Sequence, residues 1–352
     1  MIYKIKNLLK RLIHNLGFIV EQVPNDDQLF EKLEHAHEAV QHHELRKLAL
    51  QIKVANNQKL YNKILKRKVV DWDNNFNSSK FVGSGFGTGN FGVFRKVCFD
   101  DNCYFEKVYF NNTRDLLKIE WFYTNVYPLL SNISVKPPKL HKVIKGDLIT
   151  IVYFEFIDLV SLSQQQLDAA PFNISKQLLG ISNSKQMKEL INNAESSLKD
   201  YTSYYYYTRN IKTAEKDIQN LSAHKLSLHT IEVIINQQPL VLTHADIHGT
   251  NIFSNDYTLD WDSFGFFPFG FDTAFILFQK SETLDFPTLQ EVLIKEYKEI
   301  IPKDQWEDFE LSCLYFYFIF IALNENTTIK IEMQKKAFLR IKELYCNKII
   351  QN

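Results

Sequence analysis

The chain has 352 residues, of which 45% are hydrophobic and 14% are aromatic. This composition excludes a disordered chain, and the length is enough for two lobes with a substantial core. The 41 basic and 41 acidic residues give a formal net charge of zero. Net charge therefore offers no argument for a nucleic-acid partner, and we expect none.

Cysteine usage and hydropathy indicate a cytoplasmic protein. Four cysteines do not make a disulfide framework in a chain of this size, so we expect reduced thiols at Cys98, Cys103, Cys313 and Cys346. The longest apolar run, Cys313 to Leu323, is too short to cross a bilayer and predicts a buried helix. Charged residues interrupt the N-terminal apolar stretch, so it does not resemble a secretory signal.

Residues 1–75 are predicted to form a helical N-terminal extension. Within residues 1–20, apolar residues recur on one helical face, and basic residues lie elsewhere. Such a helix fits peripheral contact with an anionic membrane, which would place the protein at the inner face of the membrane. The same helix would also fit packing against the rest of the chain or a partner, and we favour this alternative over membrane contact.

Strand and turn patterns predict a small lobe over residues 76–158. The order along the chain is three strands, a helix and two strands, with tight turns near residues 100–102 and 145–147. Residues 159–352 are predicted to be mainly helical, apart from a segment around residues 243–272. The fold class is therefore α+β, with a small antiparallel sheet in one lobe and a larger helical second lobe.

A glycine-rich turn lies early in the small lobe and contains Gly85, Gly87, Gly89 and Gly92. The segment Gly87 to Gly92 fits G-x-G-x-x-G, but a strand follows it, whereas a dinucleotide fold requires a helix there. No G-K-[ST] follows either, which excludes a P-loop. A glycine-rich hairpin between antiparallel strands can instead cover a triphosphate, because its backbone N–H groups approach the phosphate oxygens unobstructed.

Phosphates under such a hairpin require a cation. Lys107 on the third predicted strand is the candidate, and Glu120 in the following helix is the acid that would orient it. Glu106 and Asp115 are alternative acids for this pairing.

The segment "THADIHGTNIF", Thr243 to Phe253, contains several potentially catalytic or metal-binding side chains close together. Zinc binding by His244 and His248 is disfavoured, because glycine and β-branched residues indicate a loop and no H-E-x-x-H occurs. A serine hydrolase is disfavoured, because no G-x-S-x-G occurs. Hard oxygen ligands suit magnesium, so Asn251 and Asp260 are candidate ligands. Asp246 then remains to accept the proton of an attacking hydroxyl.

These motifs together resemble the aminoglycoside phosphotransferase and choline kinase superfamily, which has a protein-kinase-like fold. "HADIHGTN" is similar to its H-G-D-x-H-x-x-N loop, with Ala245 at the usual glycine, a small-for-small change. "LDWDSFGFFPFGFD" is similar to its I-D-W-E…G-x-P…D segment. The resemblance implies a bilobal kinase-like fold over about residues 81–278, and the helical extension is not part of that common core.

The resemblance also implies roles for individual residues. Asp246 would be the catalytic base, Asn251 and Asp260 would bind magnesium, and Lys107 and Glu120 would anchor phosphate. The segment Phe154 to Ile157, which includes Glu155, would offer backbone hydrogen bonds to adenine. Supporting roles fall to four more residues: His244 braces the loop, His248 contacts phosphate or orders the loop, Asp262 assists the metal through water, and Asp272 holds the loop through backbone N–H groups.

We therefore expect an ATP- and Mg²⁺-dependent kinase acting on a small-molecule hydroxyl, with GTP left open as the donor. Residues 159–240 contain eight basic and seven acidic residues, a balance that favours a sugar, amino alcohol or cell-envelope glycan precursor over a polycationic aminoglycoside. A protein kinase is an alternative, disfavoured because no A-P-E follows Asp260. A non-catalytic nucleotide-binding pseudokinase or scaffold is another, disfavoured because every expected site residue is present. The oligomeric state stays open.

Overall fold

The computed structural model describes residues 83–84, 93–99, 102–110, 114–131, 133–145, 149–157, 162–221, 226–253, 257–322 and 327–351. The predicted N-terminal extension and the glycines of the predicted phosphate loop lie outside these residues. The chain divides into two compact units, residues 1–116 with 139–156 and residues 117–138 with 157–352.

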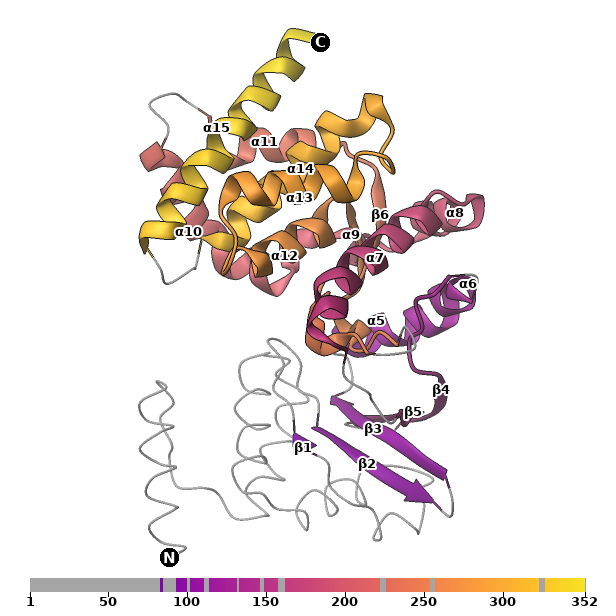
Figure 1. Ribbon diagram of the computed structural model, residues 1–352. Coiled ribbons are helices and arrows are strands. Elements are labelled where there is room, and N and C mark those ends of the chain that lie inside the picture. Colours follow the sequence, from indigo (N-terminus) through magenta and orange to yellow (C-terminus); the bar gives the residue numbers. More distant parts are fainter. Residues whose placement is uncertain are drawn as a thin grey trace, which may run out of the picture. The chain divides into compact units, whose positions relative to one another are not determined.

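The first unit contains an antiparallel sheet whose five described strands follow the order β1-β2-β3-β5-β4 (Figure 1). The strands are β1 (Gly83–Ser84), β2 (Val93–Phe99), β3 (Asn102–Phe110), β4 (Leu140–Lys145) and β5 (Ile149–Glu155). Helix α5 (Arg114–Trp121) separates β3 from β4 along the chain. The predicted order of three strands, a helix and two strands is therefore confirmed.

One expectation about this sheet is wrong. Cys103 is disulfide-bonded, although the low cysteine content predicted reduced thiols. Its partner in the register of the β2–β3 hairpin is Cys98. Directly opposed residues of adjacent antiparallel strands bring their Cα atoms to the separation that a disulfide requires, so the tight turn itself creates the opportunity. Cys313 and Cys346 are free thiols.

The second unit is mainly helical, as predicted. Its larger helices are α7 (Gln164–Ser182), α8 (Lys185–Asn193), α10 (Tyr205–Leu221), α11 (Leu228–Ile235), α12 (Phe271–Lys280), α13 (Phe286–Tyr297), α14 (Trp306–Ile321) and α15 (Thr327–Gln351). Its short elements are a π-helical turn (Phe122–Val126), α6 (Tyr127–Leu130), α9 (Ser196–Lys199) and 3-10 turns at Tyr201–Ser203, Gly249–Asn251, Trp261–Ser263 and Lys303–Gln305. Strands β6 (Leu240–Thr243) and β7 (Gly265–Pro268) form a separate antiparallel pair.

Helix α14 forms the core of this unit and packs against α10, α12 and α15. Every residue from Phe309 to Ile321 is buried, so the helix has no solvent-facing side, as expected for a helix that is apolar all round. Its one buried acid, Glu310, accepts two hydrogen bonds of 2.7 Å from Arg340 of α15. The predicted burial of the apolar run is confirmed. None of the helices described is both long and apolar enough to cross a membrane.

Residues 117–138 belong to the helical unit, and aromatic contacts join them to the segment that follows residue 260. The Phe122 ring stacks on Trp261, with centroids 4.7 Å apart. The Trp121 ring stacks on Phe264, with centroids 6.2 Å apart. Most of α5 and the turn after it therefore share a core with the segment that follows residue 260.

A glycine at the start of α12 is required by its surroundings. Gly270 has φ +93°, and a Cβ there would lie 2.8 Å from the Sγ of Cys313 and 3.0 Å from its backbone N. We expect Gly270→Ala to lower the free energy of unfolding by about 2–4 kcal/mol, through left-handed strain and overpacking. Gly180→Ala is the matched control, because no atom lies within 4 Å of its added Cβ. In α7 it should stabilise by about 0.5–1 kcal/mol. Urea unfolding measures both, and equal losses would contradict the assignment.

Candidate active site

The site begins where the short strand β6 ends. Thr243 pairs with Gly265 of β7, and its Oγ1 donates a hydrogen bond of 2.9 Å to the Gly265 carbonyl. This side-chain bond adds to the strand pairing at the end of the two-stranded ladder. The loop of residues 244–251 follows directly, so its first residue is attached to a well-held strand end.

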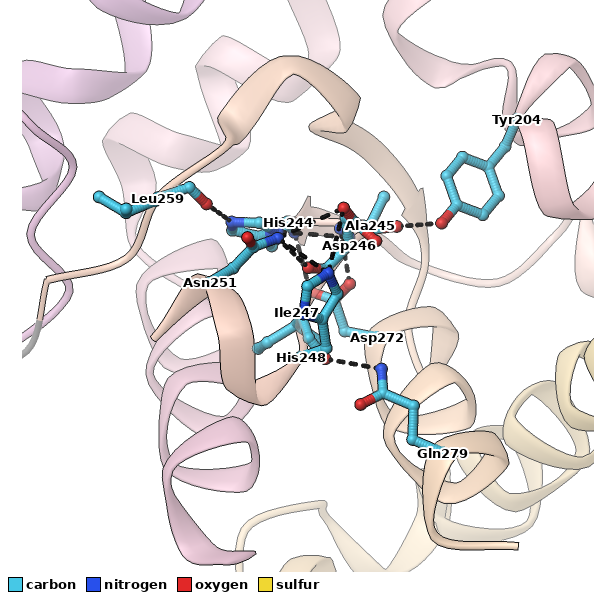
Figure 2. Close-up of polar contacts among 10 residues, drawn as sticks. All are labelled: Tyr204, His244, Ala245, Asp246, Ile247, His248, Asn251, Leu259, Asp272 and Gln279. Atoms are coloured by element: carbon cyan, nitrogen blue, oxygen red, sulfur yellow. Dashed lines mark hydrogen bonds and ion pairs between the residues drawn. The ribbon is translucent and has the colours of Figure 1, made fainter. Parts of the chain in front are cut away.

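The carboxylate of Asp272 holds the first two peptide groups of this loop (Figure 2). Its Oδ2 accepts from the backbone N–H of His244 at 2.9 Å, and its Oδ1 accepts from that of Ala245 at 2.8 Å. The resemblance implies such a contact with backbone N–H groups for Asp272. The side chain is 5% exposed. Burial raises the pKa of Asp272 from 3.8 to about 7, although the two N–H donors act in the opposite direction.

Ala245 adopts a left-handed conformation with φ +61°. A glycine adopts this conformation without strain, whereas an L-residue with a Cβ pays about 1–2 kcal/mol. Alanine in place of the glycine of the H-G-D-x-H-x-x-N motif therefore has a larger conformational cost than the small difference in side-chain size suggests. The Ala245 carbonyl accepts a hydrogen bond from the buried hydroxyl of Tyr204, which lies on the far side of the loop from Asp272 (Figure 2). Both backbone groups of Ala245 are thus bound by side chains.

His244 is fully buried and lies against the Trp261 ring, with centroids 4.6 Å apart. Its Nδ1 accepts from the backbone N–H of Asp246 at 3.3 Å, which assigns the proton to Nε2. Nε2 then donates to the Leu259 carbonyl at 2.8 Å. Burial lowers the pKa of His244, which keeps the ring neutral. The geometry gives His244 the bracing contacts that the resemblance implies.

Asp246, His248 and Asn251 converge in the loop (Figure 2). The Asn251 amide nitrogen donates to the Asp246 carbonyl at 3.0 Å and lies 3.3 Å from its Oδ2. The same nitrogen lies 3.2 Å from Nε2 of His248, which therefore acts as an acceptor. Nε2 is 3.5 Å from Oδ2 of Asp246, and the Asp246 side chain stays 19% exposed. With its nitrogen bound inside the loop, Asn251 has its amide oxygen to offer a ligand.

An isolated antiparallel bridge brings Asp260 to the same region. Ile252 and Thr258 form an antiparallel bridge, and the Leu259 N–H donates to the Asn251 carbonyl at 2.8 Å. The next residue, Asp260, is exposed and has φ +60°. The two predicted metal ligands therefore belong to adjacent, hydrogen-bonded segments. Asp262 lies two residues farther on, in the 3-10 turn, and is 3% exposed.

The remaining predicted residues lie on defined elements. Lys107 is 9% exposed on the central strand β3. The alternative acid Glu106 is fully buried, but neighbouring residues of a strand point to opposite faces, which disfavours its pairing with Lys107. Glu120 lies on α5. Glu155 ends β5, and its N–H donates to the Lys139 carbonyl at 2.8 Å. Ile157 follows two residues later.

Two supporting residues were not predicted from the sequence. Tyr204 belongs to a run of four tyrosines, and nothing in that run distinguishes it from its neighbours. Gln279 of α12 donates from Nε2 to the Ile247 carbonyl at 3.1 Å (Figure 2). Neither residue lies in the loop motif, and a contact with a backbone carbonyl far along the chain leaves no local pattern in the sequence.

No family model matches the chain, and no curated protein matches it in sequence. Solved structures are similar to it. The microcompartment-associated aminopropanol kinase is 12% identical, with 76% of this chain and 90% of that chain covered and a TM-score of 0.46. The choline kinase LicA from Streptococcus pneumoniae is 14% identical, with 81% and 98% covered and a TM-score of 0.39. The aminoglycoside phosphotransferase APH(2")-IIa, in its streptomycin–ATP complex, is 15% identical, with 82% and 98% covered and a TM-score of 0.36.

These structures are small-molecule kinases and phosphotransferases, the group that the motifs of the sequence resemble. With TM-scores below 0.5, the similarity assigns no activity to this chain. Its own residues have to carry that inference.

Removal of the Tyr204 hydroxyl tests how much its hydrogen bond to the Ala245 carbonyl stabilises the protein. Ala245 is fully buried, so Tyr204→Phe leaves its carbonyl without this donor. We expect a loss of about 1–3 kcal/mol in the free energy of unfolding, measured by urea titration. Tyr205→Phe, one residue along, is the matched control and should change stability by less than about 0.5 kcal/mol. Equal effects of the two variants would show that the Ala245 contact contributes nothing particular.

The raised pKa of Asp272 predicts a pH dependence. Between its ordinary pKa of 3.8 and the folded value of about 7, the folded protein retains a proton that the unfolded chain has released. The free energy of unfolding should therefore fall as pH rises through this window, by at most on the order of 4 kcal/mol, and level off above it. Asp272→Asn should be less stable at every pH and lack this component. Parallel pH profiles of the two proteins, measured by urea titration, would contradict the assignment.

Proposed function

We propose that the chain is an ATP- and Mg²⁺-dependent phosphotransferase that moves the γ-phosphate to a hydroxyl group of a small molecule. The observation that carries the proposal is that the loop of residues 244–251 has a firmly bound backbone and an accessible Asp246 side chain. Its backbone is bound by side chains from outside the loop, while the Asp246 side chain stays 19% exposed. A held backbone with one accessible carboxylate suits positioning of a nucleophile.

Asp246 would accept the hydroxyl proton of the acceptor and orient its oxygen toward the γ-phosphate. Two sets of contacts favour Asp246 over His248 as the base. The Asn251 amide lies 3.3 Å from Asp246 Oδ2 and opposes rotation of the carboxylate. His248 Nε2 lies closer to the Asn251 nitrogen, at 3.2 Å, than to the Asp246 carboxylate, at 3.5 Å. His248 is thereby engaged within the loop and supports its order.

The donor set fits magnesium. Asn251 would contribute its amide oxygen and Asp260 its carboxylate, and phosphate oxygens and waters would complete a six-fold shell. When bound, the metal neutralises charge that develops on the transferred phosphoryl group. The part of the chain that the structure describes holds no cluster of three or more His, Cys, Asp or Glu side chains arranged for a metal ion. A site that borrows ligands from the nucleotide needs no such cluster.

Phosphate anchoring falls to Lys107 and Glu120 in this proposal, with the glycines Gly85, Gly87, Gly89 and Gly92 covering the triphosphate. The carbonyl of Glu155 and the backbone of Ile157 would bind adenine. The eight basic and seven acidic residues between positions 159 and 240 favour a sugar, amino alcohol or cell-envelope glycan precursor as the acceptor. A polycationic acceptor would instead call for an acidic excess in the region that builds its pocket.

Asp246→Asn tests the proposal with almost no change in shape. We expect ATP consumption in the presence of Mg²⁺ and a panel of sugars, amino alcohols and aminoglycosides to fall at least about 100-fold, because the amide cannot accept the hydroxyl proton. ATP binding, measured by calorimetry, should change by less than about threefold, since Asp246 does not hold the nucleotide in this assignment.

Asp304→Asn is the matched control, because this exposed aspartate lies in the 3-10 turn Lys303–Gln305. It should leave both ATP binding and turnover unchanged. If the parent protein binds ATP but no acceptor raises its turnover above that of Asp246→Asn, the chain is a nucleotide-binding protein without this activity.

A further inference from the structure

A buried lysine supports the turn that follows Asp260. Lys118 lies on α5 and is 7% exposed. Its ammonium group donates to the Phe264 carbonyl at 2.7 Å, and the Ser263 carbonyl is 3.4 Å away. These carbonyls lie at the end of the 3-10 turn Trp261–Ser263, where the partial negative charge of a helical turn gathers. The positive charge of Lys118 thus caps this turn.

The same turn begins at Asp260, which is its N-cap residue with φ +60° and ψ +58°. This left-handed conformation is disfavoured for a side chain with a Cβ, although aspartate tolerates it better than most residues. It persists only where the surroundings hold it. Trp261 is held from one side, because its Nε1 donates to the Thr258 carbonyl at 2.8 Å. Lys118 holds the other end of the turn.

The surroundings of the ammonium group strengthen these contacts. Its nitrogen lies 5.8 Å from the Phe264 ring centroid and 5.7 Å from that of Phe267. Both rings belong to fully buried or nearly fully buried residues. Water is therefore largely excluded, and a charge-assisted hydrogen bond is stronger in such an environment. Burial of an ammonium group is nevertheless costly, so packing alone would be served better by an apolar side chain.

We propose that Lys118 is a positioning residue that sets the metal affinity of the site through Asp260. The inference rests on the proposed function, in which Asp260 is a metal ligand. The ammonium group fixes the carbonyl end of the turn, the turn fixes the backbone of its N-cap residue, and that backbone sets the direction of the carboxylate. Lys118 lies two residues before Glu120 on α5, so one helix would carry both a phosphate-anchoring acid and the support of a metal ligand.

Mn²⁺ binding in the presence of ATP tests this role without any acceptor. Mn²⁺ replaces Mg²⁺ at oxygen ligands, and free Mn²⁺ is read directly by electron paramagnetic resonance. We expect Lys118→Met, which is apolar and of similar length, to weaken Mn²⁺ binding to the ATP complex at least about tenfold, as for partners that orient metal ligands. Lys118→Arg keeps the charge and should remain within about threefold of the parent. When Asp260→Ala is also present, Lys118→Met should cause no further loss of Mn²⁺ binding.

Binding of ATP without metal should be the same in the parent and in Lys118→Met. A Lys118→Met protein with a lower melting temperature but an unchanged Mn²⁺ titration would overturn the proposal, because a purely structural role predicts that result. Lys118→Gln replaces it if Lys118→Met does not fold, and failure of both charge-free variants to fold would likewise assign a structural role. If the parent shows no ATP-dependent Mn²⁺ binding, the proposed function itself fails. If the parent and Lys118→Met both bind Mn²⁺ normally in the presence of ATP, the role of Lys118 is refuted and the proposed function is not affected.

Discussion

The bridge from the Asp272 carboxylate to two successive backbone N–H groups is the interaction on which the candidate site depends. The N–H groups of His244 and Ala245 leave the β6–β7 ladder at this point and have no strand partner. Buried backbone donors without a partner cost about 1–3 kcal/mol each. One side chain at the start of α12 satisfies both, so the end of the strand, the loop and the helix are held as a single piece. Without this bridge, the left-handed turn at Ala245 would lose one of the two side-chain contacts that hold its backbone.

The turn at Ala245 has a consequence for the residues after it. Among the residues that the structure describes, the non-glycine residues with positive φ are Ala245 and Asp260. One directly precedes the proposed base, and the other is a proposed metal ligand. Strain of about 1–3 kcal/mol at each position has to be offset by contacts that exist only in the folded state. Side chains of Asp272 and Tyr204 bind both backbone groups of Ala245.

Much of this arrangement could be predicted from the sequence, because the relevant signals are local. Strand and turn patterns predicted the sheet, and the apolar run from Cys313 predicted the buried helix α14. The contact of Asp272 with backbone N–H groups was implied by the family resemblance. The contacts of Tyr204, Gln279 and Lys118 could not be predicted, since each joins a side chain to a backbone carbonyl at least 32 residues away. Many residue types can supply such a donor. The disulfide at Cys103 was missed because a cysteine count ignores strand register, and register decides whether two cysteines oppose each other.

The charges of the two supporting side chains match the backbone groups that they bind. Asp272 is an acid and binds N–H groups where the loop starts, whereas Lys118 is a base and binds C=O groups where the turn after Asp260 ends. Peptide groups at the start of a turn present N–H donors, and those at its end present carbonyl acceptors. Exchange of either side chain for one of the opposite charge would therefore add repulsion as well as remove a bond. The polarity of the backbone thus dictates which charge can support each end, and the oxygens of Asp246, Asn251 and Asp260 lie between these two supports along the chain.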